Sequence, residues 1–97
     1  SNVLDESLPP LPSDQVILEK DKKIYINNIG LVFKGLSHGT INIELYLLEF
    51  DPNMPYPKKF TKKAARDGIW IDNVQFQLVK IKESKLRLKI LGIRELN

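Results

Sequence analysis

Hydrophobic and polar residues alternate with a period of two along much of the chain, which is typical of β-strands that bury one face. The alternation changes phase three times, after Ile26, after Leu47 and after Leu78. Because a slip of one residue moves every side chain to the other face, each change predicts a bulge, a sharp twist or burial on both faces. Such strands are typical of small sandwiches and barrels.

The pattern therefore predicts an all-β fold, a small β-sandwich or partly open β-barrel of six or seven strands with one short helical turn. Strands are predicted over residues 15–18, 24–33, 40–50, 69–71, 74–81 and 86–91, with a last edge strand in 92–97. The predicted core consists of the inward members of the alternation: Ile24, Ile26, Leu31, Phe33, Ile43, Leu45, Leu47, Phe76, Leu78, Ile81, Leu86, Leu88 and Ile90.

Turn chemistry sets the expected boundaries of these strands. Asn27-Asn28 or Gly30 is expected to form a bulge, and Asp72-Asn73 either a tight turn or a bulge. Residues 51–57 contain three prolines, so they must form a loop or an edge, and we expect the sheet to break there. Thr61 is the predicted N-cap of a helical turn over Lys62–Asp67, which ends at Gly68.

The chain of 97 residues has room for one domain. Residues 1–14 are predicted to be a flexible proline-rich leader, and residues 15–97 a single β domain. The run Leu8-Pro9-Pro10-Leu11-Pro12 favours extended geometry and suits a tether, while docking of this run to another protein is the functional alternative.

The composition leaves few routes to metal or redox chemistry. There is no cysteine and only one histidine, so disulfides and thiolate metal sites are excluded and a zinc site nearly so. We expect no metal and no cofactor. The longest apolar run is a few residues, which predicts no membrane span in these residues and leaves an upstream signal or anchor open.

Catalytic signatures are weak. Ser37 and His38 are neighbours in a glycine-flanked turn, but adjacent residues rarely form a nucleophile and base, and Glu44 and Glu49 lie on opposite faces of one predicted strand. We therefore predict no catalytic residues and no enzyme activity.

Charge divides the chain into two halves. Residues 1–57 carry four lysines against eight Asp and Glu, whereas residues 58–97 carry eleven Lys and Arg against four acids. The last predicted hairpin presents alternating cations on one face, which are candidates for binding a polyanion: Lys80, Lys82, Lys85, Arg87 and Lys89. A solvated outer face that discourages edge-to-edge aggregation is the alternative.

Aromatic residues supply candidate anchors for a protein partner. Tyr56 stands between Pro55 and Pro57, and Trp70 follows an apolar residue in a short predicted strand. Large aromatic side chains dominate many contact surfaces, so both are predicted to bind a partner. Packing of Tyr56 over its own proline loop is the alternative for that residue. The aromatic platform that single-strand nucleic-acid binders use for base stacking is missing from the basic half.

The order of elements from Ile29 to Ile90 is similar to one family of small β-domains. It has an apolar strand ending in glycine (Leu31-Val32-Phe33-Lys34-Gly35), the step Asp67-Gly68-Ile69, and a closing hairpin with the spacing Val79-x-Ile81-x4-Leu86-x-Leu88. These features resemble the homology-region domain of type II secretion inner-membrane components and the related pilus lipoproteins. The resemblance implies a non-enzymatic domain in the periplasm or envelope that contacts other components through strand edges and is tethered by a proline-rich linker.

The leading functional prediction is thus a non-catalytic protein-protein interaction module of a bacterial secretion or pilus assembly, docking by strand addition. The alternative is a nucleic-acid-binding small β-barrel that uses the basic C-terminal half.

Overall fold

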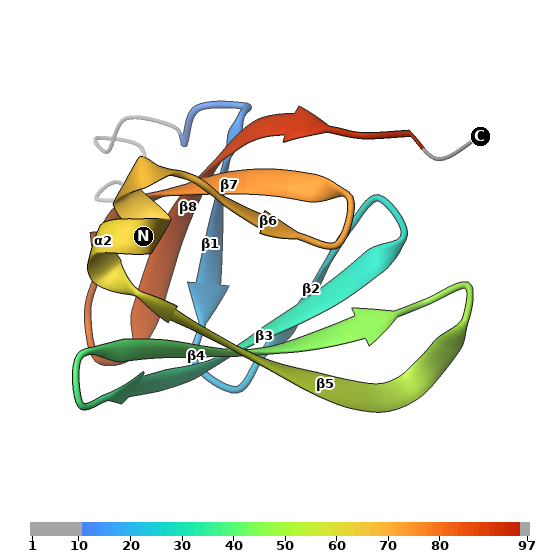
Figure 1. Ribbon diagram of the computed structural model, residues 1–97, viewed down its shortest axis with the longest axis horizontal. Coiled ribbons are helices and arrows are strands. Elements are labelled where there is room, and N and C mark those ends of the chain that lie inside the picture. The colour runs from blue at the N-terminus through green and yellow to red at the C-terminus, as the bar shows by residue number, and fades with distance from the viewer. Residues whose placement is uncertain (1–10, 96–97) are drawn as a thin grey trace, which may run out of the picture.

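Alternating apolar residues build eight strands and one short helix within residues 11–95, the part of the chain that the computed structural model describes (Figure 1). The elements are β1 (Gln15–Glu19), β2 (Lys23–Ile26), β3 (Ile29–Ser37), β4 (Thr40–Leu47), β5 (Asp51–Thr61), α2 (Lys62–Asp67), β6 (Ile69–Ile71), β7 (Val74–Ile81) and β8 (Lys85–Ile93). The all-β prediction is confirmed, with one or two strands more than expected.

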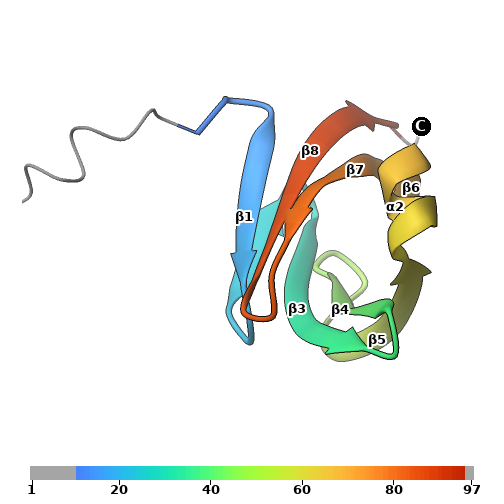
Figure 2. The same ribbon diagram turned by 90° about the vertical axis from the view of Figure 1, so that its left-hand side faces the viewer.

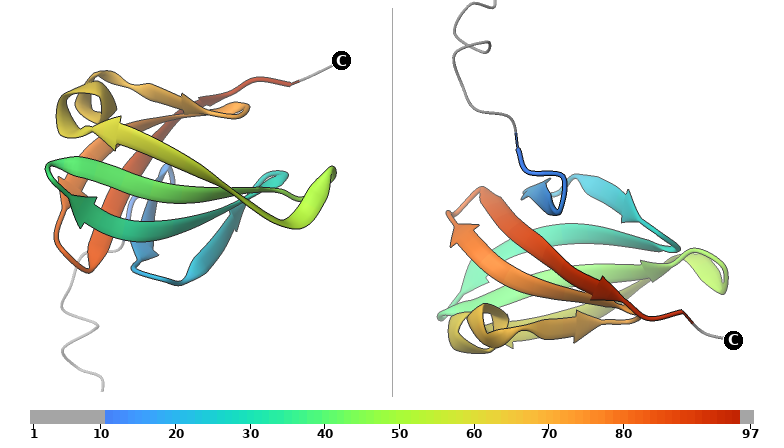
Figure 3. Two further views of the ribbon diagram at one scale, coloured as in Figure 1. Left: turned by 60° about the horizontal axis from the view of Figure 1, so that its bottom comes forward. Right: turned by 90° about the horizontal axis from the view of Figure 1, so that it is seen from above.

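Two antiparallel four-stranded sheets face each other, with orders β1-β8-β7-β6 and β2-β3-β4-β5. Seen from above, β7 and β8 cross over β3 and β4 (Figure 3). The chain passes from one sheet to the other by bending between β1 and β2, where the Asp21 N–H donates to the Phe33 carbonyl at 2.9 Å. The fold is therefore a small sandwich whose sheets are joined at this corner and again through α2, which links β5 to β6.

The predicted core is confirmed. Side chains from both inner faces form one buried cluster that contains every predicted core residue or has it packed against its margin. Ile24, Leu47, Ile81 and Ile90 are the predicted members at the margin. The core also includes Leu18, Ile29, Ile41, Ala65, Ile69, Ile71 and Val74, which were not predicted.

Two of the three phase changes are turns rather than bulges. Asn27, with φ of 54°, and Asn28 form a two-residue turn, so the single strand predicted over 24–33 is wrong: it is β2 and β3. Asparagine tolerates the left-handed region that such turns require. The strand predicted over 40–50 ends at Leu47, and Phe50 lies in the following turn, 78% exposed.

The third phase change is a bulge. The pairing of β7 with β8 shifts between Leu78 and Lys80, which leaves Val79 as the extra residue, largely exposed. Beyond the bulge, Ile81 points back toward the core. The choice left open at Asp72-Asn73 is a tight turn, since β6 and β7 pair directly across it and Asp72 has φ of 52°.

The prolines of residues 51–57 do not break the sheet, so that expectation was wrong. They lie in β5, which pairs with β4 at the edge of its sheet, with a shift between Leu45 and Leu47. An edge strand tolerates proline where the ring nitrogen faces away from its neighbour. The last edge strand predicted in 92–97 was also wrong, because Gly92 and Ile93 belong to β8, a central strand, and residues 96–97 lie outside the described range.

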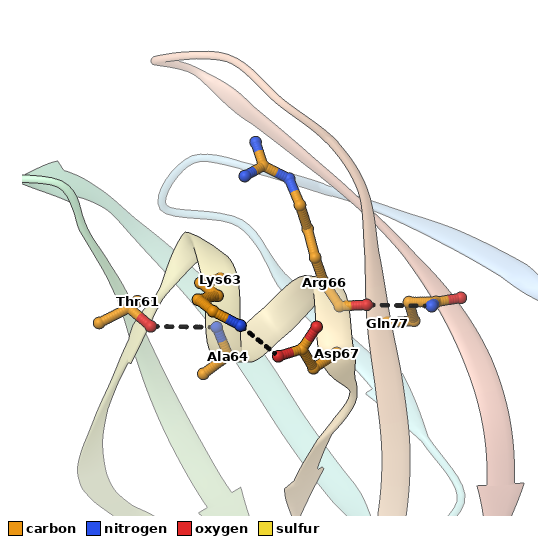
Figure 4. A network of polar contacts seen from close by, with 6 residues as sticks. All are labelled: Thr61, Lys63, Ala64, Arg66, Asp67 and Gln77. Atoms are coloured by element: carbon orange, nitrogen blue, oxygen red, sulfur yellow. Dashed lines mark hydrogen bonds and ion pairs between the residues drawn. The ribbon is translucent and has the colours of Figure 1, made fainter.

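The helix forms as predicted (Figure 4). The Ala64 N–H donates to the Thr61 hydroxyl at 3.0 Å, and Gly68, with φ of 114°, ends the helix. The Gln77 side chain donates to the Arg66 carbonyl at 3.0 Å, which fastens α2 to β7. In Figure 2, α2 lies on the side of the domain opposite to β1.

Most of the predicted leader, residues 1–10, lies outside the described residues. Its last residues are described: Pro12 accepts a hydrogen bond from the Gln15 N–H at 3.0 Å, and Asp14 accepts one from the Ile90 N–H at 2.7 Å. Asp14 therefore extends the pairing of β1 with β8. No helix among the described residues has the length and apolar character needed to cross a membrane.

Candidate protein-binding edge and cationic hollow

One edge of the first sheet, strand β1, has backbone groups without a partner among residues 11–95. In an antiparallel pair, every second residue bonds to the neighbouring strand. The bonds from Ile90 to Asp14 and from Lys20 to Ser84 show that the even-numbered residues of β1 bond to β8. The N–H and C=O groups of Ile17 consequently point away from the sheet.

On this edge, Gln15 and Glu19 each have one backbone group that is already hydrogen-bonded and one that is not. The Gln15 N–H is used in the turn to Pro12, and the Glu19 carbonyl accepts from the Lys22 N–H at 3.0 Å. The Gln15 carbonyl, both backbone groups of Ile17 and the Glu19 N–H have no partner among the described residues. These four groups are a short template for one more strand.

The other three edges are less accessible to a new strand. The β5 edge contains Pro52, Pro55 and Pro57. The β6 edge has only three residues, and α2, which precedes β6, is fastened to the neighbouring strand β7. The β2 edge is four residues long and carries Lys23 and Tyr25. Short length, prolines and lysines are common means of protecting sheet edges, and β1 has neither proline nor lysine.

The outer face beside this edge holds most of the predicted polyanion-binding residues. Leu18, Leu86 and Leu88 point into the core, so the alternate residues point outward. Ile17 pairs with Arg87, which pairs with Lys80, and these three side chains form a row across β1, β8 and β7.

Lys82 and Lys85 extend this row at the tight turn between β7 and β8, where the Lys82 N–H donates to the Lys85 carbonyl at 2.8 Å. Together the row and the turn surround an open depression of about 210 Å³. We call it the cationic hollow, lined by Ile17, Lys80, Lys82, Lys85 and Arg87.

A second depression, of about 330 Å³, continues from the hollow toward β2. We call it the β1 groove, lined by Ile17, Glu19, Lys22, Lys23, Ile24 and Lys85. Because Ile17 and Lys85 line both depressions, one concave surface runs along the free edge of β1. Within the groove, the Lys22 ammonium donates a hydrogen bond to the Glu19 carboxylate at 2.9 Å. This hydrogen bond and the charge of Lys22 lower the pKa of the Glu19 carboxyl, and the charge of Lys85 lowers it further.

The lysines and the arginine of the hollow form no ion pair within residues 11–95, although Glu19 lies across from Lys85 on the neighbouring strand. Among the described residues, no carboxylate lies within ion-pair distance of Lys80, Lys82, Lys85 or Arg87. Lys89 differs, because it faces Asp14 at 3.8 Å and does not line the hollow. The structure thus brings four of the five predicted cations together and separates the fifth.

The two predicted aromatic anchors lie elsewhere. Trp70 shares the outer face of the first sheet, but it pairs with Gln75, at the end of β7 opposite to Lys80. At about 3.3 Å per residue, roughly 16 Å separates Trp70 from the hollow. The Arg94 guanidinium stacks over the indole ring at 4.4 Å from its centre.

Tyr56 lies in β5 of the second sheet, where it pairs with Leu45 of β4 and packs, partly buried, against the core. Neither aromatic residue therefore contributes to the hollow or the β1 groove.

The residues considered for catalysis are not assembled into a site. Ser37 and His38 share a 3.1 Å hydrogen bond on the exposed turn between β3 and β4. Among the described residues, no group of three or more His, Asp or Glu side chains is placed to hold a metal ion.

Sequence reasoning missed Ile17, the residue that joins the hollow to the groove. Val16, Ile17 and Leu18 are consecutive apolar residues, which conceals the period of two. The signal that could have identified Ile17 is parity, since it lies two residues from both Gln15 and Glu19 and so belongs to the polar face.

No protein-family model matches the chain. Neither a curated protein nor a solved structure is significantly similar to it. The resemblance to secretion and pilus domains therefore stays a prediction, and function is inferred from the geometry of the described residues.

Proposed function

We propose that this domain is a non-catalytic protein-interaction module that receives an extended segment of a partner protein along β1. The observation that carries the proposal is the free edge of β1, with four unpaired backbone groups centred on Ile17 and a concave surface beside it. In strand addition, main-chain hydrogen bonds supply affinity and pockets for alternate side chains supply specificity. The edge and the concave surface provide these two components.

A place in a bacterial secretion or pilus assembly fits this mode of binding. The resembled homology-region domains contact other components through strand edges, and β1 is the edge that would serve here. Two points support a place in such an assembly: the strand pattern resembles that of the homology-region domains, and docking along β1 would use a strand edge as those domains do.

Nucleic-acid binding is the second candidate, and the unpaired cations of the hollow favour it. Binders of single strands combine such cations with aromatic residues on which bases stack. Trp70 is distant from the hollow, and Arg94 already occupies one face of its ring. Protein docking along β1 therefore accounts for more of the observed geometry.

The proposal is tested by affinity capture from a nuclease-treated native lysate with the wild-type chain, Ile17→Pro and Tyr25→Pro. Proline at 17 removes an N–H that faces away from β8, so the pairing of β1 with β8 keeps its hydrogen bonds. Tyr25→Pro is the matched control on the edge of the other sheet, since the two-residue turn after Ile26 places the Tyr25 N–H on its free side.

We expect one protein partner to be captured by wild type and by Tyr25→Pro and to be lost with Ile17→Pro. Circular dichroism of each variant checks that the fold survives. Equal capture by all three chains, or retention only of material that nuclease removes, would contradict strand addition at β1.

A further inference from the structure

We infer that the segment bound along β1 is acidic and places a glutamate carboxylate in the cationic hollow. This inference rests on the proposed function and specifies the chemistry of its partner. It follows from the charge of the hollow, from the spacing of strands and from the alternation of side chains.

The charge of the hollow is unbalanced. Four cationic side chains surround one depression of about 210 Å³, and no described carboxylate forms an ion pair with any of them. Like charges that line one depression repel one another, and a bound anion relieves that repulsion. Arg87 also offers the planar fork that binds a carboxylate through two parallel hydrogen bonds.

Strand spacing determines which anion reaches this site. A segment added to β1 lies about 4.8 Å from it, so its backbone is roughly 10 Å from that of Arg87. The side chain opposite Ile17 must cross Ile17 to meet the Arg87 guanidinium. Glutamate, which is one methylene longer than aspartate, suits this distance.

Alternation determines the rest of the segment. Residues on either side of the glutamate point to the opposite face, toward Val16, which lies partly buried at the margin of the core. Apolar side chains suit those positions. The next residue beyond points outward again and lies opposite Glu19 of the β1 groove, whose carboxylate already pairs with Lys22, so a second acid is not favoured there. The expected motif is thus apolar-Glu-apolar.

The inference is tested by fluorescence anisotropy with two labelled peptides and the full chain. The first probe is fluorescein-Gly-Gly-Val-Glu-Val-Gly-Gly-amide, and the second has Gln in place of Glu. The amide keeps the size and the hydrogen-bonding backbone but removes the charge. We expect the Glu peptide to bind about tenfold or more tightly than the Gln peptide, as suits several charge-assisted hydrogen bonds.

Two double variants locate the charge effect. Lys80→Glu/Arg87→Glu reverses two cations of the hollow, and we expect it to weaken binding of the Glu peptide by about tenfold or more. Lys58→Glu/Lys59→Glu is the matched control, since it makes the same change in net charge at exposed positions on β5 that form no ion pair among the described residues. A change of less than about twofold is expected there, because distant surface charges are screened at physiological salt.

Several results would overturn the inference. The inference fails if the Glu peptide does not bind, or if the Glu and Gln peptides bind equally. It also fails if both double variants lose the same amount of affinity for the Glu peptide, or if a ten-residue oligothymidylate binds more tightly than the Glu peptide. The Ile17→Pro variant separates this failure from failure of the proposed function. If both peptides bind equally and Ile17→Pro abolishes both, strand addition stands and the acidic partner is rejected.

Discussion

The outer faces of the two sheets differ in how their charges are balanced. On the second sheet and its corner, Lys34 donates to Asp21 at 2.6 Å and the Lys23 ammonium lies 3.6 Å from the centre of the Tyr46 ring. The Tyr46 hydroxyl in turn donates to Glu44 at 3.3 Å. On the first sheet, the cations of the hollow have no such partners among the described residues.

The difference shows which face is available to a ligand. Binding around Asp21 and Tyr46 must displace contacts that the domain already makes within itself, whereas binding at the hollow supplies contacts that are missing among the described residues. The pKa values reflect these internal contacts. The hydrogen bond between Lys34 and Asp21 lowers the pKa of the Asp21 carboxyl and raises the pKa of the Lys34 ammonium. Desolvation, together with the charge of Glu44, raises the pKa of the Tyr46 hydroxyl.

The largest expected effect is on the free energy of unfolding, and it should be the same for core substitutions in either sheet, because the two sheets share a single core. Phe33 of the second sheet and Phe76 of the first are both fully buried. Phe33→Ala and Phe76→Ala should each lower the free energy of unfolding by about 3–5 kcal/mol. Urea unfolding measures this change, and a loss below about 1 kcal/mol in either variant would mean that one sheet does not contribute to the core as described.

Removal of one lysine from each outer face should give a smaller and unequal effect. Lys23→Ala loses the contact with Tyr46 and should cost about 0.5–1 kcal/mol of unfolding free energy. Lys80→Ala should change it by less than about 0.5 kcal/mol, because it loses no ion pair. Lys23→Arg keeps a cation over the ring and serves as the control. An equal cost for the two alanine variants would remove the distinction between the faces.

The smallest effect concerns the pH dependence of the corner pair. Since folding lowers the pKa of Asp21 below its usual 3.8, the pair stabilises the domain above that pH and loses this contribution as pH falls through the folded pKa. Lys34, whose pKa is raised above 10.5, loses its contribution only as pH rises through its folded value.

Asp21→Asn tests this dependence, and asparagine suits the left-handed backbone at this position, where φ is 65°. The variant should be less stable than wild type at neutral pH, and the difference should vanish at acidic pH, below the folded pKa of Asp21. Thermal unfolding across this range measures it. A difference that is constant with pH would show that the pair does not set this dependence.

The strands of the domain were predictable where one face is buried and the other polar. Leu86, Leu88 and Ile90 alternate with Arg87 and Lys89, and the structure follows that pattern. Turns and bulges produce the same phase change in a sequence, which explains the errors at Asn27 and at Leu48. Only the pairing across the chain distinguishes them, because a turn reverses the strand and a bulge continues it.

The site was predictable in part. Alternation alone grouped the cations of the last hairpin, since both arms of a hairpin share a face. The pairing of β1 with β8 was beyond the reach of the sequence, because it joins segments that are about seventy residues apart. Ile17, the free edge and the separation of Lys89 from the hollow all depend on that pairing.

The central claim is that β1 is an open edge that accepts a strand, and amide hydrogen exchange at Ile17 tests it most directly. In the free domain, the Ile17 N–H should exchange much faster than those of Val16 and Leu18, which bond to β8. Saturation with the Glu peptide should slow exchange at Ile17 by about tenfold or more and leave Tyr25 unchanged. An Ile17 amide that is already protected in the free domain, or that is unaffected when the peptide is bound, would contradict the account.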